Sequence, residues 1–178
     1  MEPPRYLVDV RSILEDLGAV VSLDGTVDPP ALEIGTERYA PLEPAALDVT
    51  ITNTGGGIVA GGTVTVTVQA TCSRCLKEFP LTLRADVEGF FIPHGSEREM
   101  PEEQEFGFVE DGSVDLMDAL LSALALEVPL APVHAEDCAG ICPTCGADLS
   151  EGPCECAPTD SESPFAVLKD LLPGDGGE

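Results

Sequence analysis

The sequence contains no tryptophan, and aromatic residues of all kinds make up only 4% of its 178 residues. A hydrophobic core in this chain must therefore consist mainly of valine, leucine, isoleucine and alanine. The apolar content of 43% is still that of a folded protein and not of an acidic disordered chain. At this length we expect one domain that can bury a core of its own.

Basic residues are scarce as well. Eight lysines and arginines stand against 33 aspartates and glutamates, which gives a formal net charge of −25. An acidic surface repels phosphate, so this composition argues against nucleic-acid binding over a broad surface. It favours a basic partner, which the charge would attract. The less specific interpretation is that the acidity keeps the protein soluble or reflects an acidic proteome.

Long apolar runs are also missing. No stretch approaches the roughly 20 apolar residues of a membrane span. The first residues, Met1 to Arg5, do not lead from a basic segment into an apolar run, as a secretory signal would. We therefore predict a cytoplasmic protein without a membrane partner, whose cysteine thiols stay reduced.

Cysteine, by contrast, is plentiful, and five of the seven cysteines lie in the stretch 138–156. Cys142 and Cys145 form a C-P-x-C-G knuckle, in which Gly146 can adopt the positive φ that the turn needs. Together with Cys154 and Cys156 they predict a tetrahedral zinc site. Two disulfides or unligated thiols are the alternatives, and a reducing compartment favours the metal.

A second C-x-x-C pair, Cys72 and Cys75, lies far upstream at the end of a strand-like run. His134 and Cys138 would complete a Cys₃His zinc set with this pair. The competing arrangement is one site made of four cysteines, Cys72, Cys75, Cys142 and Cys145. Spacing does not choose between the two arrangements. A redox role is a third option, but the βαβ context of a thioredoxin-like site is missing.

In the middle of the chain, apolar residues alternate with threonines or charged residues. The alternation covers residues 47–51, 64–70 and 81–87, and it predicts three antiparallel strands that each bury one face. Residues 90–92 extend the third strand or begin a short fourth one. The glycines at 55–57 and 61–62 do not belong to a G-x-x-x-x-G-K-[ST] phosphate loop, so we interpret them as a hairpin or a bulge.

Helical spacing of apolar residues occurs in three places. We expect a packing helix that begins near Asp9 and stops at Gly18, a buried helix over residues 115–126, and a short helix over 164–172. Residues 19–44 are expected to be a connector with short extended pieces, interrupted by Pro29 and Pro30.

These elements predict the α+β class. An antiparallel β-sheet, open or partly barrel-like, would be covered by the 115–126 helix, with the terminal helices at its flanks and a C-terminal zinc-knuckle segment. The expected boundaries within a single domain, 1–172, are a core at 5–130, a cysteine-rich knuckle at 131–157 and a helix at 164–172. A disordered acidic tail, 173–178, would follow.

Several motifs of this chain, together with the order in which they occur, resemble the YceD-like family of large ribosomal RNA subunit accumulation proteins. A Val/Thr strand runs into Ala70-Thr71-Cys72-Ser73-Arg74-Cys75-Leu76, and the predicted helix leads into Val128-Pro129-Leu130. The later matching segments are Val133-His134, Cys138, Ile141 to Leu149, Cys154, Cys156 and Pro164 to Leu168. The resemblance covers roughly residues 5–172. Members differ in the downstream cysteines, so Cys72, Cys75 and Cys138 are the better candidates for a shared feature.

The resemblance implies a non-enzymatic role in the maturation or stability of the large ribosomal subunit, chiefly of its 23S ribosomal RNA. In many bacteria the family's gene lies beside that of a small zinc-ribbon protein of this subunit, which suggests a basic ribosomal protein as partner. Because the charge disfavours direct RNA binding, we predict action through a basic ribosomal or ribosome-assembly protein, with indirect RNA contact.

Three of the eight basic residues, Arg74, Lys77 and Arg84, cluster in sequence near the first C-x-x-C pair. They are candidates for a partner-binding patch. The alternative is that they balance nearby carboxylates or zinc thiolates.

Two other functions compete with the main prediction. One is a zinc-stabilised acidic chaperone for a cationic ribosomal protein, without an RNA role. The other is a thiol-redox or zinc enzyme. A catalytic zinc needs an open position and a nearby base. The chain has two histidines, His94 and His134, and no H-E-x-x-H or deaminase pattern. If every ligand position is filled by protein, the zinc sites are structural.

Overall fold

The computed structural model describes residues 4–97 and 105–156. The chain divides into two compact units, Met1–Cys138 and Ala139–Glu178. The first unit holds all the strands and the one helix found in the described residues. These elements are β1 (Leu7–Asp9), β2 (Val20–Val27), β3 (Leu32–Ile34), β4 (Glu37–Pro41), β5 (Ala45–Asn53), β6 (Ile58–Thr71), β7 (Glu78–Pro93), β8 (Gly107–Val109), β9 (Ser113–Asp115) and α1 (Met117–Glu127).

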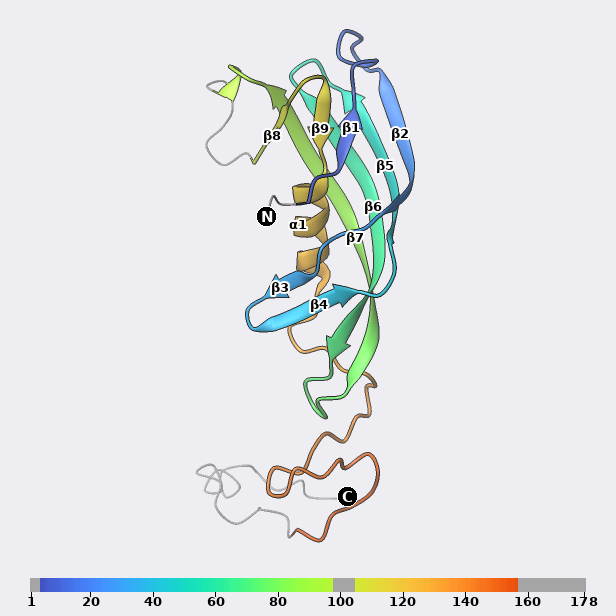
Figure 1. Cartoon of the computed structure of the whole chain (residues 1–178), viewed down its shortest axis with the longest axis vertical. Coiled ribbons are helices and arrows are strands. Elements are labelled where there is room, and N and C mark those ends of the chain that lie inside the picture. Colours follow the sequence, from blue (N-terminus) through green and yellow to red (C-terminus); the bar gives the residue numbers. More distant parts are fainter. Residues whose placement is uncertain (1–3, 98–104, 157–178) are drawn as a thin grey trace, which may run out of the picture. The chain divides into compact units, whose positions relative to one another are not determined.

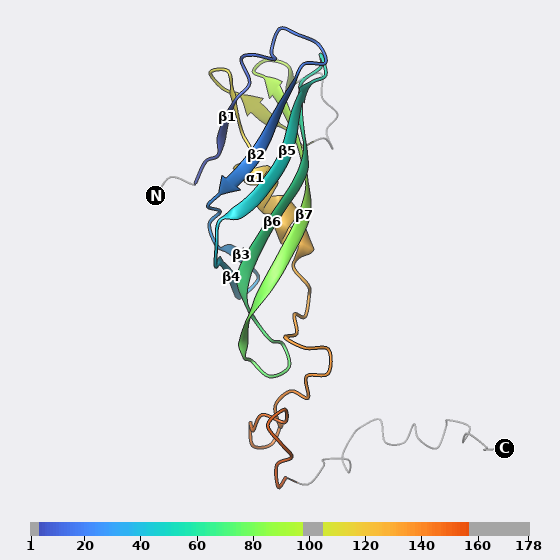
Figure 2. The same ribbon diagram turned by 90° about the vertical axis from the view of Figure 1, so that its right-hand side faces the viewer.

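The sheet is organised around the long strand β6 (Figure 1). On one side β6 pairs with β7 along its whole length, from Ile58 opposite Phe91 to Thr71 opposite Glu78. On its other side, β5 pairs with the first part of β6 and β4 with a later part. Figure 2 shows β2, β5, β6 and β7 side by side in that order. Because β2 and β7 do not pair with each other, the sheet is open.

The three predicted strands correspond to β5, β6 and β7, and their antiparallel pairing is confirmed. Alternate residues of β5 are buried, as the alternation of residue types requires; Val49 and Ile51 are fully buried. Residues 90–92 extend β7 rather than begin a new strand. The core is mainly aliphatic, with Tyr39 and Phe91 as the buried aromatic residues in the described part of the chain.

Helix α1 packs against one face of β7, and the prediction of a helix over residues 115–126 is confirmed (Figure 1). It starts slightly later than expected, because residues 113–115 pair with β1 as strand β9. The helix is not buried all round, since the Leu126 side chain is 86% exposed. With 11 residues α1 is too short to cross a membrane, and no helix in the described ranges is long and apolar enough to do so.

The predicted N-terminal helix is wrong. Residues 11–18 form successive turns, in which Ile13 N–H donates to the carbonyl of Val10 at 3.0 Å. The buried Asn53 side chain explains the difference. Its amide nitrogen donates to the carbonyls of Ile13 at 2.7 Å and Leu14 at 3.0 Å. A helix would need these carbonyls for its own backbone bonds, so tertiary contacts override the local spacing.

The segment 19–44 is more regular than predicted, because β2, β3 and β4 lie within it. The expected break at Pro29 and Pro30 is confirmed, since neither proline belongs to a strand. The predicted helix at 164–172 and the tail at 173–178 lie outside the described residues.

The two glycine groups differ in role. Glycines 55–57 lie in the β5–β6 hairpin, as predicted, with Thr54 N–H donating to the Gly57 carbonyl at 2.9 Å. Gly61 and Gly62 instead lie inside β6, where the register continues without a bulge, so the alternative of a hairpin or bulge is wrong there. A Cβ at Gly62 would lie 2.1 Å from the Asp48 carbonyl oxygen of β5, so the glycine permits close strand contact.

We therefore expect Gly62→Ala to lower the free energy of unfolding by about 1–3 kcal/mol, because β5 must move away from the added methyl group. Gly61→Ala is the matched control, since a Cβ there meets no atom within 4 Å. Urea denaturation of both variants measures the difference. Equal stability of the two would contradict this account of Gly62.

Candidate metal centres

The first group of metal-ligating side chains lies in the first unit and comes from two distant parts of the chain. Cys72 and Cys75 lie in the turn that joins β6 to β7, while His134 and Cys138 follow α1. Their ligand atoms all lie within 4.8 Å of one another, so the group could hold a metal ion. We call these four residues the Cys₃His centre.

The distances in the Cys₃His centre suit a tetrahedral ion. With metal–sulfur bonds of about 2.3 Å, two sulfurs of a tetrahedron lie about 3.8 Å apart. The Cys72 and Cys138 sulfurs are 3.8 Å apart, and the Cys75 sulfur lies 3.4 Å from Nδ1 of His134. A disulfide would require about 2.05 Å between sulfurs, and all seven cysteines are free.

Two contacts connect the β6–β7 turn to the segment after α1. Ser73 N–H donates to the Pro132 carbonyl at 2.8 Å. The Arg74 guanidinium donates from one nitrogen to the carbonyls of Glu136 and Cys138, at 3.0 Å each. The Cys₃His donors are therefore brought together by hydrogen bonds that do not themselves involve a metal.

The environment of the Cys₃His centre favours a thiolate at Cys72, whose side chain is fully buried. Burial opposes ionisation, but hydrogen bonds from the backbone of Cys75, from His134 and from the backbone of Arg74 outweigh it and lower the Cys72 pKa to about 5. At Cys75, the backbone N–H of Lys77 favours the thiolate. Burial and the neighbouring sulfurs of Cys72 and Cys138 prevail over it and raise the pKa of the Cys75 thiol. Thiolates this close to one another repel, and a cation among them would remove that repulsion.

The second group lies in the second unit and consists of Cys142, Cys145, Cys154 and Cys156, again with all sulfurs within 4.8 Å of one another. We call it the Cys₄ centre. It is more accessible to solvent than the first, since only Cys142 of its four ligands is buried, whereas in the first centre all but His134 are buried. The structure therefore brings together the four cysteines whose spacing predicted a zinc site.

The two knuckles share one backbone structure despite different sequences. In the first, Cys72 N–H donates to the Lys77 carbonyl at 2.8 Å, and Leu76 N–H donates to the Cys72 carbonyl at 2.9 Å. In the second, Cys142 N–H donates to the Ala147 carbonyl and Gly146 N–H donates to the Cys142 carbonyl, both at 2.8 Å. The residue after the second cysteine has positive φ in both, 62° at Leu76 and 73° at Gly146. Leucine is a costly residue for this conformation, which indicates that the turn is imposed by its surroundings.

The Cys₄ centre shows the same contrast, because the pKa of the Cys142 thiol is lowered while the pKa values of the Cys154 and Cys156 thiols are raised. The backbone N–H groups of Cys145 and Thr144 and the Cys154 thiol lower the pKa of Cys142 to about 6. Hydrogen bonding with Cys145 and then burial raise the pKa of Cys156 to about 12. Both centres therefore offer one ready thiolate to an incoming cation, and the remaining thiols lose protons as it binds.

Each group is complete within its own unit, and neither needs a ligand from the other. Spacing had left two groupings open, two separate centres or one site of Cys72, Cys75, Cys142 and Cys145. The structure has the grouping with two separate centres. The metal-binding role of the eight residues stays a prediction.

The three basic residues proposed as a patch have different surroundings. Arg74 is engaged by two carbonyls of the Cys₃His loop, and Lys77 also takes part in interactions. Arg84 is exposed on β7 opposite Thr65, six residues along the strand from Glu78, which corresponds to about 20 Å. The contact of Arg74 with distant carbonyls has no signal in the sequence, and its role in partner binding stays a prediction.

The two-centre arrangement predicts two metal ions per chain. Elemental analysis of protein purified without oxygen should show one ion lost in Cys72→Ser and a different one lost in Cys145→Ser, because each change removes one ligand of one centre. Ser73→Ala and Thr144→Ala are the matched controls, since they alter the same knuckles without removing a sulfur. Loss of one shared ion by both cysteine variants would contradict two separate centres.

Comparison with known proteins agrees with the motifs. The family described as "Large ribosomal RNA subunit accumulation protein YceD" matches residues 60–172. Uncharacterized proteins of Mycobacterium bovis and Mycobacterium tuberculosis are each 36% identical over 151 residues, which cover 82% of this chain and 72% of theirs. An uncharacterized protein of Mycobacterium leprae is 32% identical over 172 residues, 94% of this chain and 77% of its own. No solved structure matches the chain. The chain thus belongs to the YceD family of large ribosomal RNA subunit accumulation proteins.

Proposed function

We propose that this protein is a non-enzymatic cytoplasmic factor that supports accumulation of 23S ribosomal RNA during assembly of the large ribosomal subunit. The observation that carries the proposal is membership of a family described by accumulation of this RNA. The protein acts through a basic ribosomal or ribosome-assembly protein, and its contact with RNA is indirect.

The distribution of charge supports a protein partner over RNA. With a net charge of −25, the chain repels phosphate over most of its surface. Several of its few cations are also already neutralised. Arg5 pairs with Glu110 and Asp115, Arg11 with Asp9 and Arg38 with Glu33. What remains is a field that attracts cationic proteins and speeds their association.

The metal in both centres is proposed to be zinc, in a structural role. Cys₃His and Cys₄ are typical donor sets for structural Zn²⁺, and thiolates favour this ion over magnesium or calcium. When bound, the ion supplies a fixed tetrahedral cross-link. In the first unit, the ligands would fasten the segment that follows α1 to the β6–β7 turn. In the second, they would close a loop of chain that is otherwise held by few hydrogen bonds.

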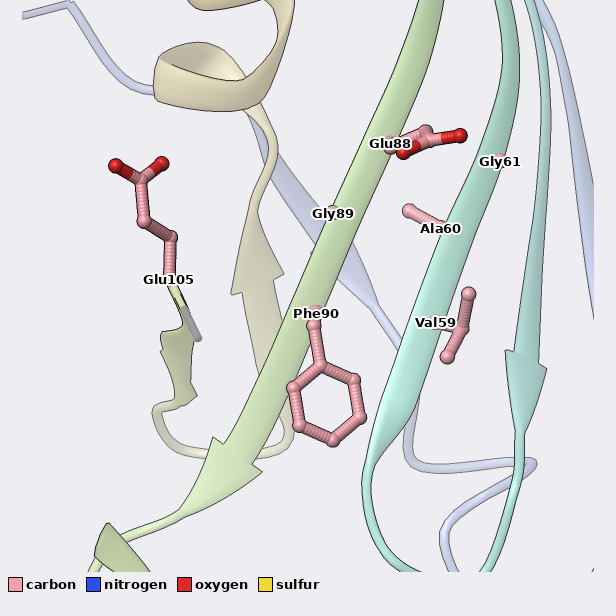
Figure 3. A pocket seen from close by; sticks show the side chains of 7 residues that line it. All are labelled: Val59, Ala60, Gly61, Glu88, Gly89, Phe90 and Glu105. Atoms are coloured by element: carbon pink, nitrogen blue, oxygen red, sulfur yellow. The ribbon is translucent and has the colours of Figure 1, made fainter. Parts of the chain in front are cut away.

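The same donor sets support a role without catalysis. Hydrolytic zinc sites leave one position for water and place a base near it. Here protein side chains supply four donors in each centre. The pocket between β6, β7 and Glu105 offers two glutamates among small and apolar residues, and no histidine or cysteine (Figure 3).

The proposal predicts which proteins the chain captures. In nuclease-treated lysate at low salt, the tagged full chain should retain basic proteins of the large subunit, and release them at about 0.5 M salt, where the Debye length is only a few ångströms. Mass spectrometry identifies the captured proteins. Loss of capture after nuclease treatment would mean that RNA mediates the contact, against the proposal.

The RNA readout separates the proposal from the alternative of a chaperone without an RNA role. Cells that lack the chain should contain less 23S relative to 16S ribosomal RNA, and the wild-type chain should restore the ratio. An unchanged ratio together with intact capture would favour the chaperone.

A further inference from the structure

The edge of β7 is open over most of its length. β7 pairs with β6 from Glu78 to Phe91 on one side. On the other side, its pairing in the described part of the chain is limited to the last three residues, which meet β8 at 91–93. The backbone N–H and C=O groups of alternate residues between Leu81 and Glu88 therefore face outward at the sheet edge. Such an edge is a template for another strand, and natural proteins commonly cover or interrupt it.

Two hollows meet at the part of this edge near Glu88 to Phe90. One, of about 610 Å³, is lined by Val59, Gly61, Phe90 and their neighbours on the outward face of the sheet (Figure 3). The other, of about 210 Å³, lies between β7, the start of β8 and α1. They share Glu88, Gly89, Phe90 and Glu105. Space is thus present on both faces of the same strand edge, which an added strand requires for its alternating side chains.

The charged side chains at the edge of β7 indicate which kind of peptide segment it would bind. Along the outward face of β7, Asp86 and Glu88 are exposed, and Glu105 lines the same two hollows as Glu88 from the other side of β7 (Figure 3). Arg84 is the one cation on this face of β7, at the end away from the hollows. Val59, which is 37% exposed, and Phe90 supply apolar surface next to Glu88 in the same hollow. The edge therefore suits an extended segment that presents cationic side chains to Asp86 and Glu88 and an apolar side chain to Phe90.

The same charges disfavour two other occupants. Two copies of a chain with a net charge of −25 repel each other. The segments 98–104 and 157–178 of this chain both contain more acidic than basic residues, so they are repelled by Asp86 and Glu88 as well. A cationic segment of another protein gains from the contact.

We propose that the edge of β7 from Leu81 to Glu88 is the docking strand for an extended lysine- and arginine-rich segment of the partner protein. The segment adds to the sheet beside β7, with its backbone hydrogen-bonded to the open edge. Its cations lie beside Asp86 and Glu88, and an apolar side chain enters the hollow at Phe90. This inference rests on the proposed function, because it places the basic partner on a particular strand.

The first test uses a synthetic peptide of about ten residues that alternates lysine with valine, long enough to follow the edge. A control peptide carries the same lysines but has proline in place of alternate valines, which removes the backbone N–H donors at those positions without changing the charge. The full chain should bind the first peptide roughly tenfold more tightly than the second, because proline cannot complete a ladder. Equal affinities would mean attraction by charge alone and would overturn the docking strand.

Amide hydrogen exchange of the full chain locates the contact. In the free protein, alternate amides between Leu81 and Glu88 should exchange rapidly, because they point away from β6. The lysine–valine peptide should slow them, and the proline peptide should not. Slow exchange in the free protein would show that the edge is already covered by this chain or a second copy, against the proposal.

Charge variants give a matched comparison. Asp86→Lys with Glu88→Lys should weaken peptide binding roughly tenfold by repulsion. Asp24→Lys with Asp48→Lys makes the same change in net charge at exposed sites on β2 and β5, and should have little effect. Asp86→Asn with Glu88→Gln should give an intermediate loss, and is the safer variant for folding. Equal losses in both lysine pairs would contradict a specific edge.

The same variants applied to capture from lysate separate this inference from the proposed function. Capture of basic proteins that is lost in the Asp86/Glu88 variant and kept in the Asp24/Asp48 variant supports both. Capture that neither variant changes would overturn the docking strand and leave the proposed function standing. Absence of captured basic proteins with the wild-type chain would count against the proposed function itself.

Discussion

The continuous antiparallel ladder between β6 and β7 is the interaction on which the rest of the structure depends. It runs from Ile58 to Thr71 without a break, and β6 carries β5 and β4 along its opposite side. At one end of the ladder, the turn between the two strands presents Cys72 and Cys75 to the segment after α1. Along its outer side, the ladder leaves the backbone of β7 available to a partner. The Cys₃His group and the open strand edge are thus both positioned by one hairpin.

The features that sequence predicted well are those that local chemistry determines. Alternation of apolar residues with threonine or charged residues predicts a strand with one buried face, so β5, β6 and β7 follow from the pattern. The Cys-x-x-Cys spacing similarly determines the direction of two sulfurs. The helix α1 is evident from its leucine spacing, although the exposure of Leu126 shows that a broad apolar face need not be fully covered.

The features that sequence missed depend on contacts between distant residues. Residues 11–18 have helical spacing, but their carbonyls are taken by Asn53, about forty positions later. The pair Gly61 and Gly62 suggested a bulge, whereas Gly62 is needed where the Asp48 carbonyl approaches β6. Spacing also left two groupings of the cysteines open. Whether Cys138 lies near Cys72 depends on the path that the chain takes after α1, and the sequence does not give that path. None of these partners is visible without the fold.

The central claim is that two closed centres, one Cys₃His and one Cys₄, stabilise the chain. X-ray absorption at the zinc edge of the intact protein tests it most directly, because sulfur and nitrogen ligands differ in bond length, at about 2.3 and 2.0–2.1 Å. The account predicts a mean coordination between three and four sulfurs per ion, a minor nitrogen contribution from His134, and no oxygen. An oxygen ligand that exchanges with solvent, or a spectrum of pure sulfur coordination, would contradict it.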